Sequence, residues 1–157
     1  MIVIVVILIV ALDQLSKIFI SNTLTLNQSF PVIRDFFHVT LVHNTGIAFG
    51  MLKGNSTIIL IVTIVGLAII AYSLRKDLLA NHCLSDWKKI PAIDKLAMSL
   101  ILGGAIANMI DRIRLGYVVD FLDFRIWPVF NIADSCITIG AFILIWKLII
   151  PSKIKKI

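Results

Sequence analysis

Apolar residues of this 157-residue chain gather in four long blocks, separated by polar or charged stretches. At about 1.5 Å of rise per residue, a helix needs about 20 apolar residues to cross roughly 30 Å of hydrocarbon. The blocks reach or approach that length. They predict four transmembrane helices, at about residues 1–20, 56–74, 93–110 and 131–150.

The first block lacks the basic region and the small-residue cleavage site of a secretory signal peptide. We therefore expect it to be retained as a transmembrane helix, although Asp13, Gln14 and Lys17 interrupt its apolar sequence.

The stretches between the blocks predict one charged loop (75–95) and two mixed loops (21–55 and 111–130). Residues 36–43 are aromatic and β-branched with partial alternation, which favours short strands. Gly46 and Gly116 are typical of turns. Because no internal repeat appears, residues 1–157 are expected to form a single membrane domain.

Composition agrees with a membrane protein, since 59% of the residues are hydrophobic, whereas a soluble domain has about 45–50%. The net charge is +6, but no basic stripe interleaved with aromatic residues favours nucleic-acid binding. Most basic residues fall in the 75–95 loop or near the C-terminus: Arg75, Lys76, Lys88, Lys89, Lys95, Lys147, Lys153, Lys155 and Lys156. By the positive-inside rule, the termini and this loop are cytoplasmic, and the two mixed loops lie outside.

The acidic residues are all Asp, and several of them lie where charge is costly. Asp13, Asp111 and Asp134 lie in or at the ends of the apolar blocks, and Asp120 stands in a short apolar run. An ionisable residue at membrane depth indicates a functional site by default.

The predicted topology brings these residues to the outer ends of the helices. Asn108, Asp111 and Arg112 are spaced i, i+3 and i+4 and therefore share one helix face. The complete set expected on the outer side is Asp13, Lys17, Asn44, Gly46, Asn108, Asp111, Arg112, Asp120, Asn131 and Asp134.

Several members of this set have structural interpretations that stay open. Asp111 and Arg112 suit an interfacial ion pair as well as a chemical role. Asn108 and Asn131 suit helix bridging by hydrogen bonds, and Asn131 also suits a helix N-cap. Asp13 suits structural support as well as chemistry.

Asp120 and Asp134 differ because neither has a Lys or Arg beside it in the sequence. In one cavity, burial and mutual repulsion would leave one carboxyl protonated and the other ionised. Such a pair activates water and protonates a leaving amine without a metal or cofactor. Asp35 and Asp123 are more typical of solvated loop acids.

Two other classes of protein agree less well with the sequence. A proton-coupled transporter would place its charges near the bilayer midplane and often has inverted repeats, which this chain lacks. A structural subunit, with polar residues only joining helices, leaves the loop carboxylate of Asp120 unexplained. A serine or zinc intramembrane protease is disfavoured, because the sequence contains neither a GxSG nucleophile motif nor an HExxH motif.

The polar motifs and their order resemble the type II signal peptidases of bacteria, over roughly residues 13–135. The matching stretches are Asp13-Gln14 with Lys17, Asn44-Thr45-Gly46-Ile47-Ala48-Phe49, Gly103 to Arg112, Gly116 to Phe121, and Phe130 to Ser135. Two departures occur: Ala107 replaces a common Gly, and helix one lacks the usual short charged start.

The resemblance implies four transmembrane helices with a small extracytoplasmic β-sheet cradle, in the bacterial cytoplasmic (inner) membrane. It implies an aspartyl endopeptidase that cuts prolipoproteins before their diacylglyceryl-modified cysteine, contacts membrane lipids and is blocked by globomycin. The catalytic pair falls on Asp120 and Asp134. The supporting positions fall on Asp13, Lys17, Asn44, Gly46, Asn108, Asp111, Arg112 and Asn131.

Overall fold

The computed structural model describes residues 2–46, 61 and 91–149. Three long helices occur in these residues: α1 (Ile2–Thr23), α4 (Ala92–Leu115) and α5 (Ile132–Ile149). They are joined by a three-stranded antiparallel sheet of β1 (Ser29–Ile33), β2 (Phe37–Asn44) and β3 (Val118–Asp123). The helix expected at 56–74 lies outside the described residues, as does most of the 75–95 loop.

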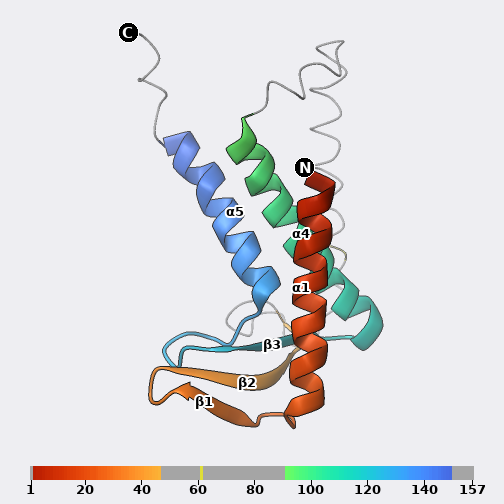
Figure 1. The fold of residues 1–157 in the computed structure, drawn as a ribbon, viewed down its shortest axis with the longest axis vertical. Helices are drawn as coiled ribbons and strands as arrows, with labels where there is room; N and C mark the ends of the chain where they lie inside the picture. The colour runs from red at the N-terminus through yellow and green to blue at the C-terminus, as the bar shows by residue number, and fades with distance from the viewer. Residues whose placement is uncertain (1, 47–60, 62–90, 150–157) are drawn as a thin grey trace.

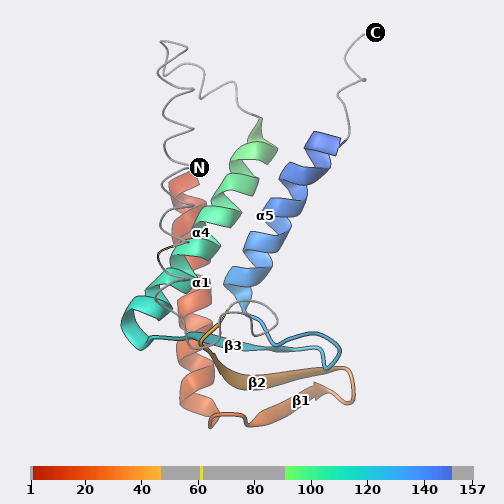
Figure 2. The same cartoon turned by 180° about the vertical axis from the view of Figure 1, so that it is seen from behind.

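The helices lie side by side, with α4 in contact with both α1 and α5, and the sheet covers one end of them (Figures 1 and 2). The end of α1, the end of α4 and the start of α5 all meet at the sheet, as the sequence predicted (Figure 1). The 22-residue α1 and the 24-residue α4 are each long and apolar enough to span a membrane.

Close helix packing depends on small residues, also as predicted. A Cβ added at Gly104 of α4 would lie 2.4 Å from the carbonyl oxygen of Ala133 on α5. A Cβ at Gly140 of α5 would lie 2.6 Å from the carbonyl oxygen of Ala97. Neither space admits a side chain, so the two backbones touch where lipid would provide no hydrophobic drive for association.

α1 and α4 extend further than the hydrophobic pattern indicated, whereas α5 agrees with it. α4 was expected to end near residue 110, but it continues to Leu115 and stops at Gly116, which has φ +79°. The Gly116 N–H donates to the carbonyl oxygen of Arg112, so this left-handed residue caps the helix. Asp111 and Arg112 are therefore held on a helix instead of entering a loop.

The predicted strand at residues 36–43 is confirmed as β2, which pairs with both β1 and β3. β3 occupies part of the 111–130 segment that was expected to be a loop. Its residues Val118, Val119 and Phe121 are buried, and Asp120 lies opposite Val42 in the register. A strand that is buried on both faces lacks the alternation of apolar and polar residues by which strands are predicted. For that reason the short apolar run at β3 was not predicted to be a strand.

Candidate active site

An ion cluster joins α1 to the end of α4 beside the sheet. The ammonium of Lys17 lies 2.7 Å from Asp13 and 2.8 Å from Asp111, and all three side chains are buried. Because removing one partner would leave an uncompensated buried charge, the three residues are expected to hold one arrangement. Asp13 therefore has the structural role that the sequence left open, as one of the charges that hold this cluster together.

Both acids of this cluster also bind backbone. Asp13 Oδ1 accepts the N–H of Ala133 at 2.9 Å, at the start of α5, where the helix dipole favours a negative charge. Asp111 Oδ2 accepts the N–H of Val119 at 3.2 Å on β3. The cluster therefore fixes the positions of α5 and β3 relative to α1 and α4.

Gln14 is a member of the cluster that sequence reasoning left without a role. Its side-chain amide donates to Asp111 Oδ1 at 2.8 Å and to the carbonyl oxygen of Ala107 at 3.3 Å. The available signal was a polar residue next to Asp13 within an apolar block.

Two asparagines extend the network from the ion cluster. Asn108 Oδ1 accepts from Lys17 at 3.0 Å and from Asn131 Nδ2 at 3.1 Å, while its amide donates to Asp134 Oδ1 at 2.7 Å. The expected bridging of helices by Asn108 and Asn131 is confirmed by these bonds.

Asp134 lies in the first turn of α5 as half of a reciprocal cap. Its backbone N–H donates to Asn131 Oδ1 at 2.8 Å, and its Oδ2 accepts the Asn131 N–H at 3.4 Å. This is the arrangement of a capping box, and it confirms the predicted N-cap role of Asn131.

Asp120 is 1% exposed and lies at the other side of Asn131. Its Oδ1 accepts from Asn131 Nδ2 at 2.6 Å, and its Oδ2 accepts from Asn44 Nδ2 at 2.8 Å. Burial, together with the negative charge of Asp134, raises the pKa of Asp120 to about 7, against the bonds from the two asparagines. Asn131 thus joins two carboxyl groups that affect each other's protonation.

Arg112 and Gly46 form a further side of the site. The guanidinium donates to the Gly46 carbonyl oxygen at 3.2 Å and to the Asn108 carbonyl oxygen at 3.4 Å. Asn44 Oδ1 accepts the Gly46 N–H at 2.9 Å, which makes the turn that was expected there. Arg112 makes no ion pair with Asp111 among the described residues, so the proposed interfacial pair is not formed there.

Asp123 is not the solvated loop acid that the sequence suggested, since it is only 5% exposed. Its carboxylate accepts from Thr40 at 2.7 Å and from the backbone and side chain of Arg125. Asp35, in contrast, is exposed as expected. The structure therefore brings all ten predicted site residues into one network and leaves Asp35 and Asp123 outside it.

The chemistry of the network is that of carboxyl groups and amides. Within residues 2–46 and 91–149, no three His, Cys or Asp side chains are grouped as metal ligands. An acid whose pKa lies near neutrality, as that of Asp120 does, can exchange a proton with a substrate or water when a second carboxyl group lies beside it. Fold and site together define a helical protein with membrane-length helices and, at the end of its bundle, an aspartate pair of which Asp120 is buried and Asp134 half-buried.

Comparison with known proteins identifies the family. The signal peptidase (SPase) II family matches residues 5–150. A lipoprotein signal peptidase of Moorella thermoacetica is 45% identical over 148 residues, covering 92% of this chain and 90% of the relative. One of Caldanaerobacter subterraneus subsp. tengcongensis is 42% identical and covers 99% of this chain and 100% of the relative.

Two solved structures described as bacterial membrane enzymes share the fold. The first has a TM-score of 0.83 at 36% identity, covering 99% of this chain and 91% of that one. The second has a TM-score of 0.76 at 35% identity, covering 94% and 92%. The chain belongs to the signal peptidase II family, and it is an aspartic endopeptidase of a bacterial membrane.

Proposed function

We propose that this protein removes signal peptides from prolipoproteins by cleaving before the diacylglyceryl-modified cysteine, with Asp120 and Asp134 as its catalytic pair. Membership of the signal peptidase II family and relatives named lipoprotein signal peptidase support the substrate. The observation that carries the assignment of the pair is the Asn131 side chain, which bonds to the carboxyl of Asp120 and to the backbone of Asp134.

The reaction needs one ionised and one protonated carboxyl. Because burial and the charge of Asp134 raise the pKa of Asp120 to about 7, we assign the shared proton to Asp120. Asp134 takes a proton from water, the water oxygen bonds to the scissile carbonyl carbon, and Asp120 gives its proton to the carbonyl oxygen. As the C–N bond breaks, the amine leaves with the proton that Asp134 took from water, and one hydroxyl of the tetrahedral intermediate returns its proton to Asp120. The new C-terminus is then a carboxylic acid, and the pair again holds one proton.

The supporting residues have two kinds of role in this proposal. Asn44, Asn108 and Arg112 orient the acids and bind the peptide backbone of the substrate, since their amides and guanidinium lie around the pair. Asp13, Lys17 and Asp111 are positioning residues that hold the helix ends together through buried charges.

The membrane arrangement follows from the charge pattern and the family. We infer four transmembrane helices in the cytoplasmic membrane, with cytoplasmic termini and the sheet and catalytic pair at the outer face. The lipid of the substrate then lies in the bilayer while its peptide reaches the pair at the bundle end. Membrane lipids surround the site, and globomycin-type cyclic peptides inhibit it.

The test is cleavage of a diacylglyceryl-modified prolipoprotein peptide by the purified protein in detergent. Asp120→Asn and Asp134→Asn are each expected to lower kcat by at least about a hundredfold, because each removes a group that transfers a proton. Asp35→Asn, which changes an exposed carboxylate, is the matched control and should keep parental activity.

Asp123→Asn tests the assignment more closely, because Asp123 lies on the same strand as Asp120. It should retain most of the kcat, although it loses bonds within the sheet. Loss of activity at Asp123 with activity retained at Asp120 would overturn the pair. A parent protein that binds the lipopeptide and never cuts it would overturn the function.

A further inference from the structure

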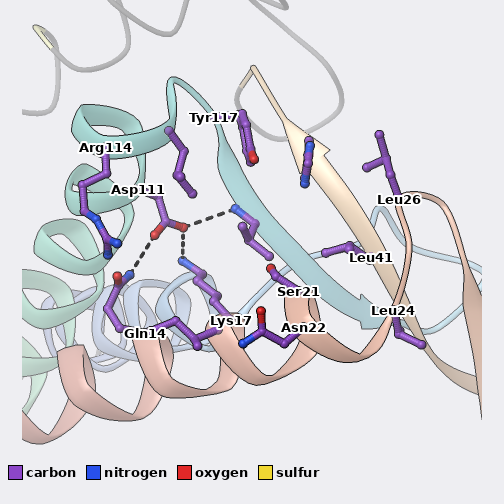
Figure 3. Close-up of a pocket in the computed structure, with 14 residues that line it drawn as sticks. Gln14, Lys17, Ser21, Asn22, Leu24, Leu26, Leu41, Asp111, Arg114 and Tyr117 are labelled. Carbon is purple, nitrogen blue, oxygen red and sulfur yellow. Dashed lines mark hydrogen bonds and ion pairs between the residues drawn. The ribbon is translucent and has the colours of Figure 1, made fainter.

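A cavity of about 410 Å³ lies beside the ion cluster of Lys17 and Asp111 and is not bordered by the proposed catalytic pair. It is lined by the second half of α1, the end of α4 and neighbouring residues of β2 and β3, and neither Asp120 nor Asp134 borders it (Figure 3). Its volume is in the range of small-molecule sites, about 300–1,000 Å³.

Among the described residues that line the cavity, the one carboxylate is already occupied. Asp111 accepts hydrogen bonds from Gln14 and the Val119 N–H and pairs with Lys17, as the dashed lines in Figure 3 show. The floor of the cavity therefore has no free anionic acceptor to attract a cationic ligand.

Unused donors surround this floor. The guanidinium of Arg114, the hydroxyls of Ser21 and Tyr117 and the amide of Asn22 make no hydrogen bond or ion pair with other described residues. Burial lowers the pKa of His43, whose ring stacks on Tyr117, so the imidazole adds no charge at neutral pH. The cavity thus offers one free positive charge and several neutral donors, which suits an anion with several oxygens.

The position of the cavity indicates where such an anion comes from. Its rim is apolar, with Ile18, Leu24 and Leu115 among the lining residues. Leu15 and Phe19, on the same part of α1, are 64% and 67% exposed. Since α1 is long and apolar enough to span a membrane, this rim lies where an acyl chain passes into the headgroup region.

We propose that this cavity binds the phosphate headgroup of an anionic phospholipid. Arg114 pairs with the phosphate, the hydroxyl and amide donors bind its oxygens and the glycerol, and the leucine rim contacts the start of the acyl chains. This lipid is an additional ligand, separate from the lipid attached to the substrate.

The experiment measures lipid binding to the purified full chain in detergent by native mass spectrometry. The probes are phosphatidylglycerol, phosphatidylcholine and soluble glycerol 1-phosphate. Phosphatidylglycerol should bind roughly tenfold more tightly than phosphatidylcholine, and Arg114→Gln should remove that preference, the loss expected of one charge-assisted hydrogen bond. Tyr117→Phe should weaken phosphatidylglycerol binding by a smaller factor.

Arg34→Gln is the matched control, because it removes the same charge from a fully exposed position on the sheet loop. It should leave the preference unchanged, and thermal unfolding of both Arg variants shows whether they remain folded. Equal loss in the two variants, or no loss in Arg114→Gln, would overturn the site. Glycerol 1-phosphate binding as tightly as phosphatidylglycerol would overturn the assignment to a lipid. None of these readings depends on peptidase activity.

Discussion

Asp120 and Asp123 are three residues apart on β3, and their surroundings shift their pKa values in opposite directions. Burial and the charge of Asp134 raise the pKa of Asp120 to about 7. Burial also acts to raise the pKa of Asp123, but hydrogen bonds from Thr40 and Arg125 outweigh it and lower that pKa. Residue type and strand position therefore do not decide the protonation state of either acid; the groups facing each one do.

The pH dependence of stability should distinguish these two acids. The folded protein keeps the Asp120 proton between its ordinary pKa of 3.8 and about 7, whereas the unfolded chain has lost it. The contribution of Asp120 to the free energy of unfolding therefore falls as pH rises through this window and is constant above it. Asp120→Asn should raise the Tm relative to the parent at about pH 8 and have little effect near pH 4.

Asp123→Asn is the comparison of opposite sign. Because the folded pKa of Asp123 is lowered, its ionised form stabilises the protein, and this contribution is lost as pH falls. The variant should therefore lower the Tm at about pH 8. Thermal unfolding of both variants in detergent across this pH range checks the pair, and equal shifts of one sign would contradict it.

At the scale of elements, the start of α5 both begins a helix and forms the site. Asn131 caps the helix through the backbone of Asp134 and donates to Asp120 on β3. Close packing of α5 on α4 at Gly104 keeps this helix start next to Asn108. The site geometry therefore depends on a contact at Gly104 in which the backbones of α4 and α5 touch with no side chain between them.

Gly104→Ala tests that contact. The added methyl group would meet the Ala133 carbonyl oxygen at 2.4 Å, so α5 must move. We expect a loss of at least about 1–3 kcal/mol in stability, the usual cost of overpacking, together with reduced cleavage. Denaturant or thermal unfolding and peptide cleavage provide the two measurements.

Gly103→Ala is the matched control from the next residue of the same helix. Its methyl group would meet the Cβ and Cδ1 of Ile9 at 3.0 Å, a longer contact than the 2.4 Å at Gly104, so α1 must move by only a few tenths of an ångström. The loss should be below about 1 kcal/mol. A larger loss at Gly103 than at Gly104 would show that the α4–α5 contact is not the limiting one.

Across the whole molecule, the burial of polar groups differs between the end of the helix bundle at the sheet and the opposite end. The buried network gathers at the sheet end, while Lys147 and Asp94 form a more exposed ion pair between α5 and the start of α4 (Figure 1). Between these ends, α1 presents large apolar side chains outward, such as Val3, Leu8 and Leu12, each more than half exposed. Such a surface is stable in lipid and costly in water.

Leu8→Arg should therefore reduce the amount of folded protein in the membrane fraction. Leu8 is 56% exposed within α1, and an arginine near the centre of a span costs about 2.5–3.5 kcal/mol on insertion scales. Ile126→Arg is the control, since Ile126 is 89% exposed in the segment after β3. It should keep the parental yield, and equal yields of both variants would contradict a lipid-facing α1.

The sequence by itself determined the three long helices of the described residues, the strand at β2 and the ten residues of the network, nine of them polar and one, Gly46, in a turn. Helix-length apolar blocks need no knowledge of the fold, and charged or amide residues in such blocks are costly enough to indicate a site. The resemblance of these motifs to the type II signal peptidases further indicated which reaction the site residues catalyse.

Only the tertiary structure decided which contacts these residues make, how deeply they are buried and which of them hold a proton. The role of Gln14 and the burial of Asp123 depend on residues up to about a hundred positions away, which no local pattern records. The raised pKa of Asp120 has the same origin, because burial and the charge of Asp134 exist only once β3 and α5 meet. Local sequence sets where the chain is apolar, whereas the protonation of a buried acid is set by the groups that folding brings to it.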